Sequence, residues 1–294
     1  MQPRTASWWC RLCETARCWQ CSTRQSAEGA LTEEDEAARK RLIAQTSARK
    51  EILDALEAVG YWRFSGDLAD KAKIAAADLA AAFPELMRQE IKRNPESKKG
   101  SFLVSIMQDK AFFAYPSVMN LVTDERIAGL AARYLGEAPV LSGVNLWWSP
   151  VNKSATSSQL FHFDEADNRQ LKLFLNVHEI TADHGPFTLV PADLGKRVSD
   201  KKGDTHGRFT DEEVEALAPR QSWQSFEGPA GALAAVDSSR CLHYGSRGNT
   251  KERVVAMFQF TKCTAPLAQA PDWGQQLGVF LDGKSELQNR LFCR

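Results

Sequence analysis

The stretch Gln159-Leu160-Phe161-His162-Phe163-Asp164 carries the residue types best suited to chemistry. On a β-strand, residues two positions apart project from the same face, so His162 and Asp164 would point toward one place. An imidazole and a carboxylate suit a divalent ion of borderline hardness, and a second histidine would complete three ligands with three octahedral positions open. His243 is the best candidate for that histidine, because a late strand could return it to His162. A hydrogen-bonded structural histidine is the alternative for His162 alone.

Arg253 adds a second feature. It follows His243 by ten residues and begins the strand-like run RVVAMFQF. An arginine on a strand can form a bidentate ion pair with a carboxylate. A metal together with an arginine therefore indicates a chelating oxo-acid as cosubstrate. For an isolated arginine, a solvated charge at the end of a strand is the alternative.

Helical patterns dominate the first half of the chain. Thr32 and Asp35 are spaced like a capping box, and the apolar positions that follow run up to Gly60, which predicts a helix end there. We further expect a strand at 60–64, a helix over Leu68–Phe83 closed by Pro84, and a helix over Asp124–Leu135 closed by Gly136.

After Pro139 the pattern changes to short β-type runs separated by turn residues. The run 170–177 alternates between two faces, which indicates a sandwich or a barrel. One face carries Leu171, Leu173, Leu175 and Val177, and the other carries Gln170, Lys172, Phe174 and Asn176. Long helical segments do not recur between the runs, which disfavours a parallel sheet. The predicted strands are VLSGVNLWW, SQLFHFD, QLKLFLNVHEI, FTLV, GALAAVD, CLHY and RVVAMFQF.

The region from about Asn145 to Phe260 resembles the phytanoyl-CoA dioxygenase-like family of iron(II)/2-oxoglutarate-dependent oxygenases. Two segments carry the resemblance, FHFDEADNRQLKLFLNVHEITADHGPFTLVP and VDSSRCLHYGSRGNTKERVVAMFQF, and they occur in the family's order. The resemblance implies a double-stranded β-helix, or jelly roll, with a Gly-Pro turn at 185–186 between two of its strands. It also implies functions for five residues: His162, Asp164 and His243 would hold iron, Arg253 would bind the distal carboxylate of 2-oxoglutarate, and Lys172 would contact the same cosubstrate.

The implied reaction consumes molecular oxygen, converts 2-oxoglutarate to succinate and carbon dioxide, and hydroxylates the substrate. Asp164 favours hydroxylation, because related halogenating enzymes lack this carboxylate. Two segments depart from the family pattern. Residues 191–194 are Pro-Ala-Asp-Leu where Pro-Gly-Ser-His is familiar, and the interval from His243 to Arg253 is one residue shorter than in several members, which predicts a bulge or loop adjustment.

The composition of the chain limits the classes of partner that it is expected to bind. Lys+Arg and Asp+Glu number 37 each, and this balance argues against a nucleic-acid clamp or a polybasic membrane surface. The longest apolar runs are too short for a membrane span. The odd count of seven cysteines, with no apolar signal segment, predicts a cytoplasmic protein with reduced thiols.

Residues 1–30 form a separate Cys/Trp-rich extension. Cys10, Cys13, Cys18 and Cys21 follow the pattern C-x2-C-x4-C-x2-C. The gap between the two pairs is short beside the roughly 12–20 residues usual in zinc sites, so a disordered extension or a misassigned translation start is favoured over metal binding.

We therefore expect residues 31–294 to form one α+β domain, in which helices buttress a jelly-roll barrel. The predicted function is an iron(II)- and 2-oxoglutarate-dependent dioxygenase that hydroxylates a small organic substrate. One alternative is a cupin-like metal enzyme that does not use 2-oxoglutarate, and Arg253 discriminates between the two because only the oxoglutarate hypothesis requires it. The other alternative is a non-catalytic binding protein on the same barrel.

Overall fold

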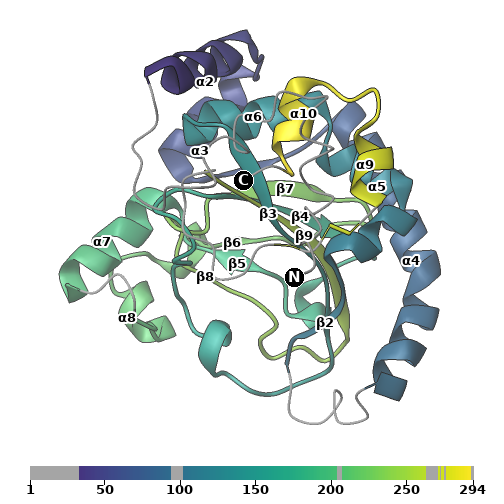
Figure 1. The fold of residues 1–294 in the computed structure, drawn as a ribbon. Coiled ribbons are helices and arrows are strands. Elements are labelled where there is room, and N and C mark those ends of the chain that lie inside the picture. The colour runs from purple at the N-terminus through teal and green to yellow at the C-terminus, as the bar shows by residue number, and fades with distance from the viewer. Residues whose placement is uncertain are drawn as a thin grey trace, which may run out of the picture.

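Two antiparallel sheets form the centre of the molecule (Figure 1). The computed structural model describes residues 33–93, 102–203, 207–262, 271, 273–274 and 276–292, so the N-terminal extension and its four cysteines lie outside the described residues. The large sheet has the order β1-β7-β4-β9-β3-β2, and the small sheet has the order β6-β5-β8. The strands are β1 Tyr61–Arg63, β2 Val104–Gln108, β3 Pro139–Ser149, β4 Leu171–Asn176, β5 Thr188–Leu189, β6 Gln224–Ser225, β7 Leu233–Val236, β8 His243–Tyr244 and β9 Arg253–Lys262.

Helices cover the outer face of the large sheet and flank the small one. In Figure 1, α7 and α8 lie beside the small sheet, and α4, α5 and α9 lie on the opposite side of the molecule. The helices are α2 Glu33–Gln45, α3 Lys50–Val59, α4 Asp67–Arg93, α5 Pro116–Val122, α6 Glu125–Leu135, α7 Ala192–Lys202, α8 Asp211–Glu215, α9 Gln276–Leu281 and α10 Glu286–Arg290, with short 3-10 turns at η1 Asp109–Ala114, η2 Ser157–Gln159, η3 Ala182–His184 and η4 Arg220–Ser222. Within the described residues, none of these helices combines the length and the apolar character that crossing a membrane requires.

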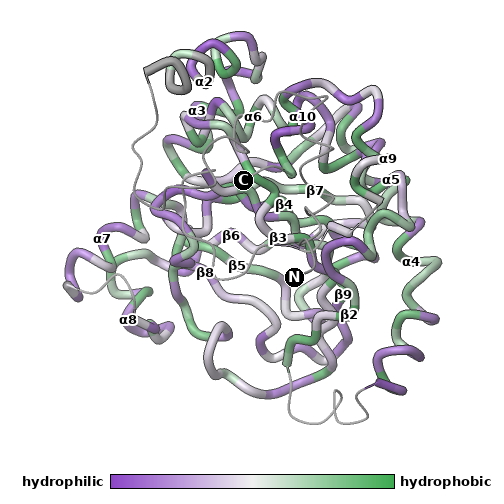
Figure 2. Tube along the Cα trace, in the orientation of Figure 1, coloured by the Kyte–Doolittle hydropathy of each residue, from purple (hydrophilic) through white to green (hydrophobic). Residues whose placement is uncertain are grey.

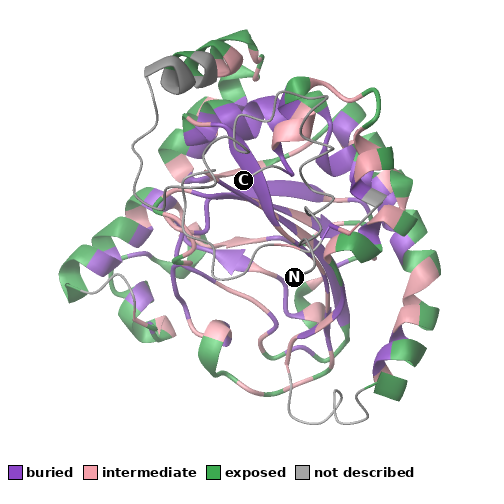
Figure 3. Cartoon of the chain, in the orientation of Figure 1, coloured by how far each residue is buried: buried purple, intermediate pink, exposed green. Residues whose placement is uncertain are grey.

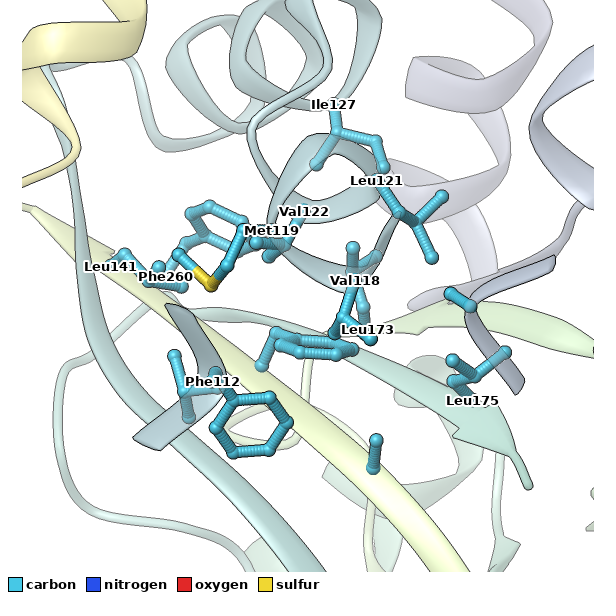
Figure 4. Close-up of a cluster of buried hydrophobic side chains, with 14 of the residues drawn as sticks. Phe112, Val118, Met119, Leu121, Val122, Ile127, Leu141, Leu173, Leu175 and Phe260 are labelled. Carbon is cyan, nitrogen blue, oxygen red and sulfur yellow. The ribbon is translucent and has the colours of Figure 1, made fainter. Parts of the chain in front are cut away.

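Alternation along β4 divides the interior into two layers. Leu171, Leu173 and Leu175 are fully buried in the main apolar core, which they share with residues of α5 and α6 (Figure 4). Phe174 faces the other way and packs with Ala234 and residues of the small sheet. The strands in the middle of the molecule are therefore mostly buried, and the exposed residues gather on the outer sides of the helices (Figure 3). Hydropathy follows the same division, with polar stretches along the outer helices such as α4 and α7 (Figure 2).

Two predicted helix ends are confirmed. Gly60 ends α3 in the left-handed conformation with φ +83°, which glycine adopts without the steric cost that a Cβ would bring. Asp124 caps α6 by accepting a hydrogen bond from the backbone N–H of Arg126, and Gly136 ends this helix. The sequence signals thus placed α6 to within one residue.

Two helix predictions were wrong. Pro84 does not end a helix but lies inside α4, which continues to Arg93. Proline removes one backbone hydrogen bond there, but Met87 is buried beyond it and Leu86 and Ile91 pack against the main core, and this tertiary packing outweighs the break. The helical pattern that approaches Gly60 forms two helices, α2 and α3, and Thr32 lies outside the described residues.

Candidate metal centre

The structure brings His162, Asp164 and His243 together. One donor atom from each lies within 4.8 Å of the other two. The Nε2 atom of His243 is 3.4 Å from Oδ2 of Asp164, and Nε2 of His162 is 3.9 Å from Oδ1 of the same carboxylate. The sequence prediction that these three side chains share one place is thus confirmed as geometry.

The backbone that carries the histidines is a single reciprocal pair. The N–H of His162 donates to the carbonyl of His243 at 3.0 Å, and the N–H of His243 donates back at 3.0 Å. Directly opposed residues of an antiparallel pair project from the same face, which sets the two rings 4.3 Å apart. The predicted strand SQLFHFD is wrong as a regular strand, because its pairings are the isolated bridges Phe161↔Phe209 and His162↔His243. Asp164 is held by its N–H, which donates to the carbonyl of Ser238 at 2.9 Å.

Hydrogen bonds to the backbone orient both rings. Nδ1 of His162 lies 2.9 Å from the carbonyl of Leu160, and Nδ1 of His243 lies 2.9 Å from the carbonyl of Cys241. Each Nδ1 must carry a proton to donate to a carbonyl, so in the neutral form of either ring Nε2 is the atom that can bind a metal. Such outer hydrogen bonds typically fix the tautomer and the ring orientation of a metal-binding histidine.

Protonation states also suit a metal. Burial, followed by the neighbouring His243, lowers the pKa of His162 to about 3, so this imidazole is neutral at pH 7. Burial alone would raise the pKa of Asp164, but Lys172 and His243 together outweigh it and hold this pKa well below its usual range. The group thus offers neutral imidazole and ionised carboxylate, the forms in which these side chains bind metals. A divalent metal fits these donors.

Lys172 lies next to this group, on β4. Its Nζ donates to Oδ2 of Asp164 at 2.5 Å, and the lysine side chain is largely buried. The ion pair occupies one carboxylate oxygen and leaves Oδ1 facing His162. The contact between Lys172 and 2-oxoglutarate that the family resemblance implies stays a prediction.

Arg253, the first residue of β9, is buried with only 6% of its surface exposed. Its Nη1 donates to the carbonyl of Gly185 at 3.1 Å and its Nη2 to Oγ of Ser149 at 3.4 Å. Among the described residues, no carboxylate lies within ion-pair distance of the guanidinium. Burial lowers the pKa of Arg253 to about 10, so it is still a cation at pH 7. A buried cation without a counter-charge is costly and calls for an anion.

The residues around Arg253 lie next to the residues around His243. A Cβ added to Gly245, two residues after His243, would lie 3.4 Å from both terminal nitrogens of Arg253. Gly185 accepts the hydrogen bond from Arg253, and Phe187, two residues further, has its ring 5.1 Å from that of His243. The buried arginine therefore lies beside the same part of the small sheet as the histidine. The predicted Gly-Pro turn at 185–186 joins β4 to β5 after η3.

A cavity of about 550 Å³ opens at Asp164, a volume typical of sites for small molecules. It lies between α3, α7 and the loop that follows Asp164. Of the residues that line it, Asp164 was predicted as a metal ligand, and Ala192 and Asp193 belong to the segment 191–194 that departs from the family pattern. Local sequence gave no signal for the others. The cavity is lined by Ala58, Phe163, Asp164, Glu165, Asp167, Asn168, Ala192, Asp193, Lys196, Ser199, Ser239 and Arg240.

Two neighbouring residues have structural functions. Cys241 is fully buried, and burial raises the pKa of its thiol far above the ordinary value, which suits a packing residue and not a nucleophile. Trp148 is buried and donates from its indole nitrogen to Glu252, whereas its neighbour Trp147 is half-buried.

Comparisons with known proteins locate the fold. No protein-family model matches the chain, and no curated protein matches it. Solved structures do: the epimerase SnoN in complex with Fe3+, alpha-ketoglutarate and nogalamycin RO matches at 18% identity and a TM-score of 0.50, over 80% of this chain and 91% of that one. EctD from S. alaskensis with 2-oxoglutarate and 5-hydroxyectoine matches at 17% identity, TM-score 0.49, over 82% of this chain and 81% of that one. AviO1 from Streptomyces viridochromogenes Tue57 matches at 16% identity, TM-score 0.47, over 76% and 98%.

At 18% identity the match to SnoN concerns the fold. The chain shares with that enzyme a mixed architecture of helices and antiparallel sheets. The arrangement of His162, Asp164 and His243 comes from this chain's own geometry.

Proposed function

We propose that the protein is an iron(II)- and 2-oxoglutarate-dependent oxygenase that hydroxylates a small organic molecule. The observation that carries the proposal is the buried cation of Arg253, which has no counter-charge among the described residues, beside the group formed by His162, Asp164 and His243. A 2-oxo diacid matches both features, because it offers a metal-chelating end and a second carboxylate. The cofactors are iron(II), 2-oxoglutarate as cosubstrate and molecular oxygen.

The strand order supports a double-stranded β-helix. Along the chain, β3 lies in the large sheet, the bridge at His162 joins the small sheet, β4 returns to the large sheet, and β5 and β6 belong to the small one. The last three strands alternate again, with β7 and β9 in the large sheet and β8 in the small one. Alternation between two facing sheets is the winding of a jelly roll.

Each residue of the site has a distinct task. His162, Asp164 and His243 would hold the metal, with the two Nδ1–H groups keeping the rings in place. Lys172 would keep Oδ2 of Asp164 engaged, so that the carboxylate binds through its other oxygen. Arg253 would bind the distal carboxylate of 2-oxoglutarate and fix the orientation of its oxo-acid end. Iron with a bound 2-oxo acid supplies the oxidation of a C–H bond by molecular oxygen.

The cavity at Asp164 supports a small-molecule substrate, because its volume suits a ligand of that size. Hydroxylation is favoured because Asp164 occupies the position that related halogenating enzymes leave without a carboxylate. The two alternatives leave Arg253 unexplained, since neither requires a buried cation at this place. The cytoplasmic location and the phytanoyl-CoA dioxygenase-like family remain predictions from the sequence.

An anaerobic titration with Fe(II) and then 2-oxoglutarate tests the proposal without knowledge of the substrate. We expect a saturable visible charge-transfer band from the metal-bound 2-oxo acid. The variants His162→Ala, Asp164→Ala and His243→Ala should lose the band, while circular dichroism shows that they are folded. Iron binding without the band would favour the cupin-like enzyme, and no iron binding would favour the non-catalytic protein.

A further inference from the structure

Gln170, Ser238 and Thr261 are fully buried polar side chains with no hydrogen-bond partner among the described residues. Both the amide nitrogen and the amide oxygen of Gln170 lack a partner, as do the two hydroxyl oxygens. Leaving a buried polar group unpaired costs about 1–3 kcal/mol. Native proteins therefore seldom do so, and ordered water usually satisfies such groups.

The three side chains gather at one end of the large sheet, and we call them the polar row. The pairing Leu171↔Phe260 sets Gln170 opposite Thr261. The pairing Lys172↔Val236 puts Ser238 just past the end of β7 on the other side of Gln170. Alternation turns Gln170 and Thr261 away from the apolar core that Leu171 and Phe260 enter, and onto the face that carries Lys172.

The loop 164–169, which joins Asp164 to β4, is fixed to both sides of the polar row. The N–H of Asp164 donates to the carbonyl of Ser238 at 2.9 Å. At the other side, the backbone N–H of Lys262 donates to Asp167 at 3.2 Å, and Nζ of Lys262 donates to Asn168 at 2.6 Å. The polar row therefore lies at the base of the loop that presents Asp164.

The polar groups of the row indicate what kind of molecule it binds. The row offers two N–H donors, an amide oxygen and two hydroxyls, all of them uncharged, so it matches a small neutral molecule that both donates and accepts. A buried water typically makes about three hydrogen bonds to groups of this kind. We propose that the polar row binds internal water, which links β4, β7 and β9 under the loop and makes the three residues positioning residues for Asp164. The effect on Asp164 as a metal ligand rests on the proposed function, whereas the water site does not.

The sign of a stability change tests the water site. Thr261→Val and Ser238→Ala each delete one hydroxyl with little change of shape. If water is bound, each variant loses hydrogen bonds, and its unfolding equilibrium constant should rise about 5- to 100-fold in urea denaturation. The double variant should lose less than the product of the two single effects, because the same water is lost. If the row is dry, each variant removes an unsatisfied group and becomes more stable, which would overturn the proposal.

Thr261→Ser is the matched variant, since it keeps the hydroxyl at the same position. The unfolding equilibrium constant of Thr261→Ser should therefore differ less from the native value than the constant of Thr261→Val. A crystal structure of the native protein should show water within hydrogen-bond distance of at least two members of the polar row, and its absence there would contradict the proposal.

A second readout tests the positioning of Asp164. Thr261→Val should weaken Fe(II) binding several-fold and leave the 2-oxoglutarate requirement at saturating iron unchanged. Unchanged Fe(II) affinity would refute the positioning effect. If the native protein binds no iron, the proposed function fails, and the stability and crystallographic measurements still decide whether the row holds water.

Discussion

Replacing Arg253 by methionine tests whether its charge binds 2-oxoglutarate or stabilises the fold. At pH 7 the guanidinium is charged in both the folded and the unfolded chain, but burial lowers its pKa from the ordinary 12.5 to about 10. This difference corresponds to about 3 kcal/mol of destabilisation by the buried charge, which is relieved as the pH rises through 10 toward 12.5. Methionine removes that cost but leaves the hydroxyl of Ser149 without the donor Arg253, which offsets about 1–3 kcal/mol of the gain. The carbonyl of Gly185 still accepts a hydrogen bond from the backbone N–H of Ser246 at 3.0 Å.

We therefore expect the free energy of unfolding of ligand-free Arg253→Met to equal that of the native protein or exceed it by up to about 2 kcal/mol. Chemical denaturation under argon, with and without Fe(II) and 2-oxoglutarate, measures both states. A ligand at 100 times its dissociation constant should stabilise the native protein by about 2.7 kcal/mol. The 2-oxoglutarate part of that gain should vanish in Arg253→Met.

Arg247→Met is the matched control. Arg247 is ion-paired with Asp211 and lies over the ring of Tyr244, so this variant should be less stable without ligand and keep the gain from 2-oxoglutarate. A gain that persists in Arg253→Met would remove Arg253 from the binding site. If the free energy of unfolding of ligand-free Arg253→Met falls by more than about 3 kcal/mol, the function of Arg253 is structural.

Three further variants test the site and its support. Lys172→Met removes the ammonium from Asp164 and should weaken Fe(II) binding about 10- to 100-fold by calorimetric titration; unchanged affinity would contradict the positioning of Asp164 by Lys172. Because the pKa of His162 is about 3 when folded and near 6.5 when unfolded, metal-free stability should fall as the pH drops from about 6.5 toward 3. His162→Gln should flatten that slope in urea denaturation, and an unaltered slope would refute the cause. Gly60→Ala should lower the free energy of unfolding by about 2–4 kcal/mol in thermal denaturation, since φ is +83° and the new Cβ meets Sγ of Cys241. Gly66→Ala, at φ +70° in open space, should cost only the backbone part, and equal losses would discount the contact.

The two-residue spacing was enough to predict that His162 and Asp164 lie close together. It was not enough to describe the segment that carries them, which is not a regular strand. His162 and Asp164 lie two positions apart, as on a strand, but the chain forms strand-like pairs only at Phe161 and His162. Each pairing there is a single bridge, so the segment is strand-like only where the partners Phe209 and His243 touch it. Both partners are distant in the chain, and local pattern carries no information about them.

Non-local packing also explains the other differences. Pro84 signals a helix end by its own chemistry, and only the burial of Met87 against the main core shows why α4 continues. The ion pair of Lys172 with Asp164 and the isolation of the Arg253 charge depend on which side chains the two sheets bring together. The ends of α6 depend on local signals, so its start was predicted to within one residue and its end at Gly136 was predicted correctly.

The reciprocal backbone pair of His162 and His243 has a consequence for how the protein folds. Both histidines depend on one closure between chain segments that four strands and two α-helices separate. This contact of high sequence separation costs chain entropy before it gains anything. We therefore expect these donor atoms to assemble late, when most of the fold is in place. The two amide hydrogens of the pair should accordingly exchange with solvent only through openings that also dismantle the donor set, so their exchange rates report the lifetime of the assembled centre.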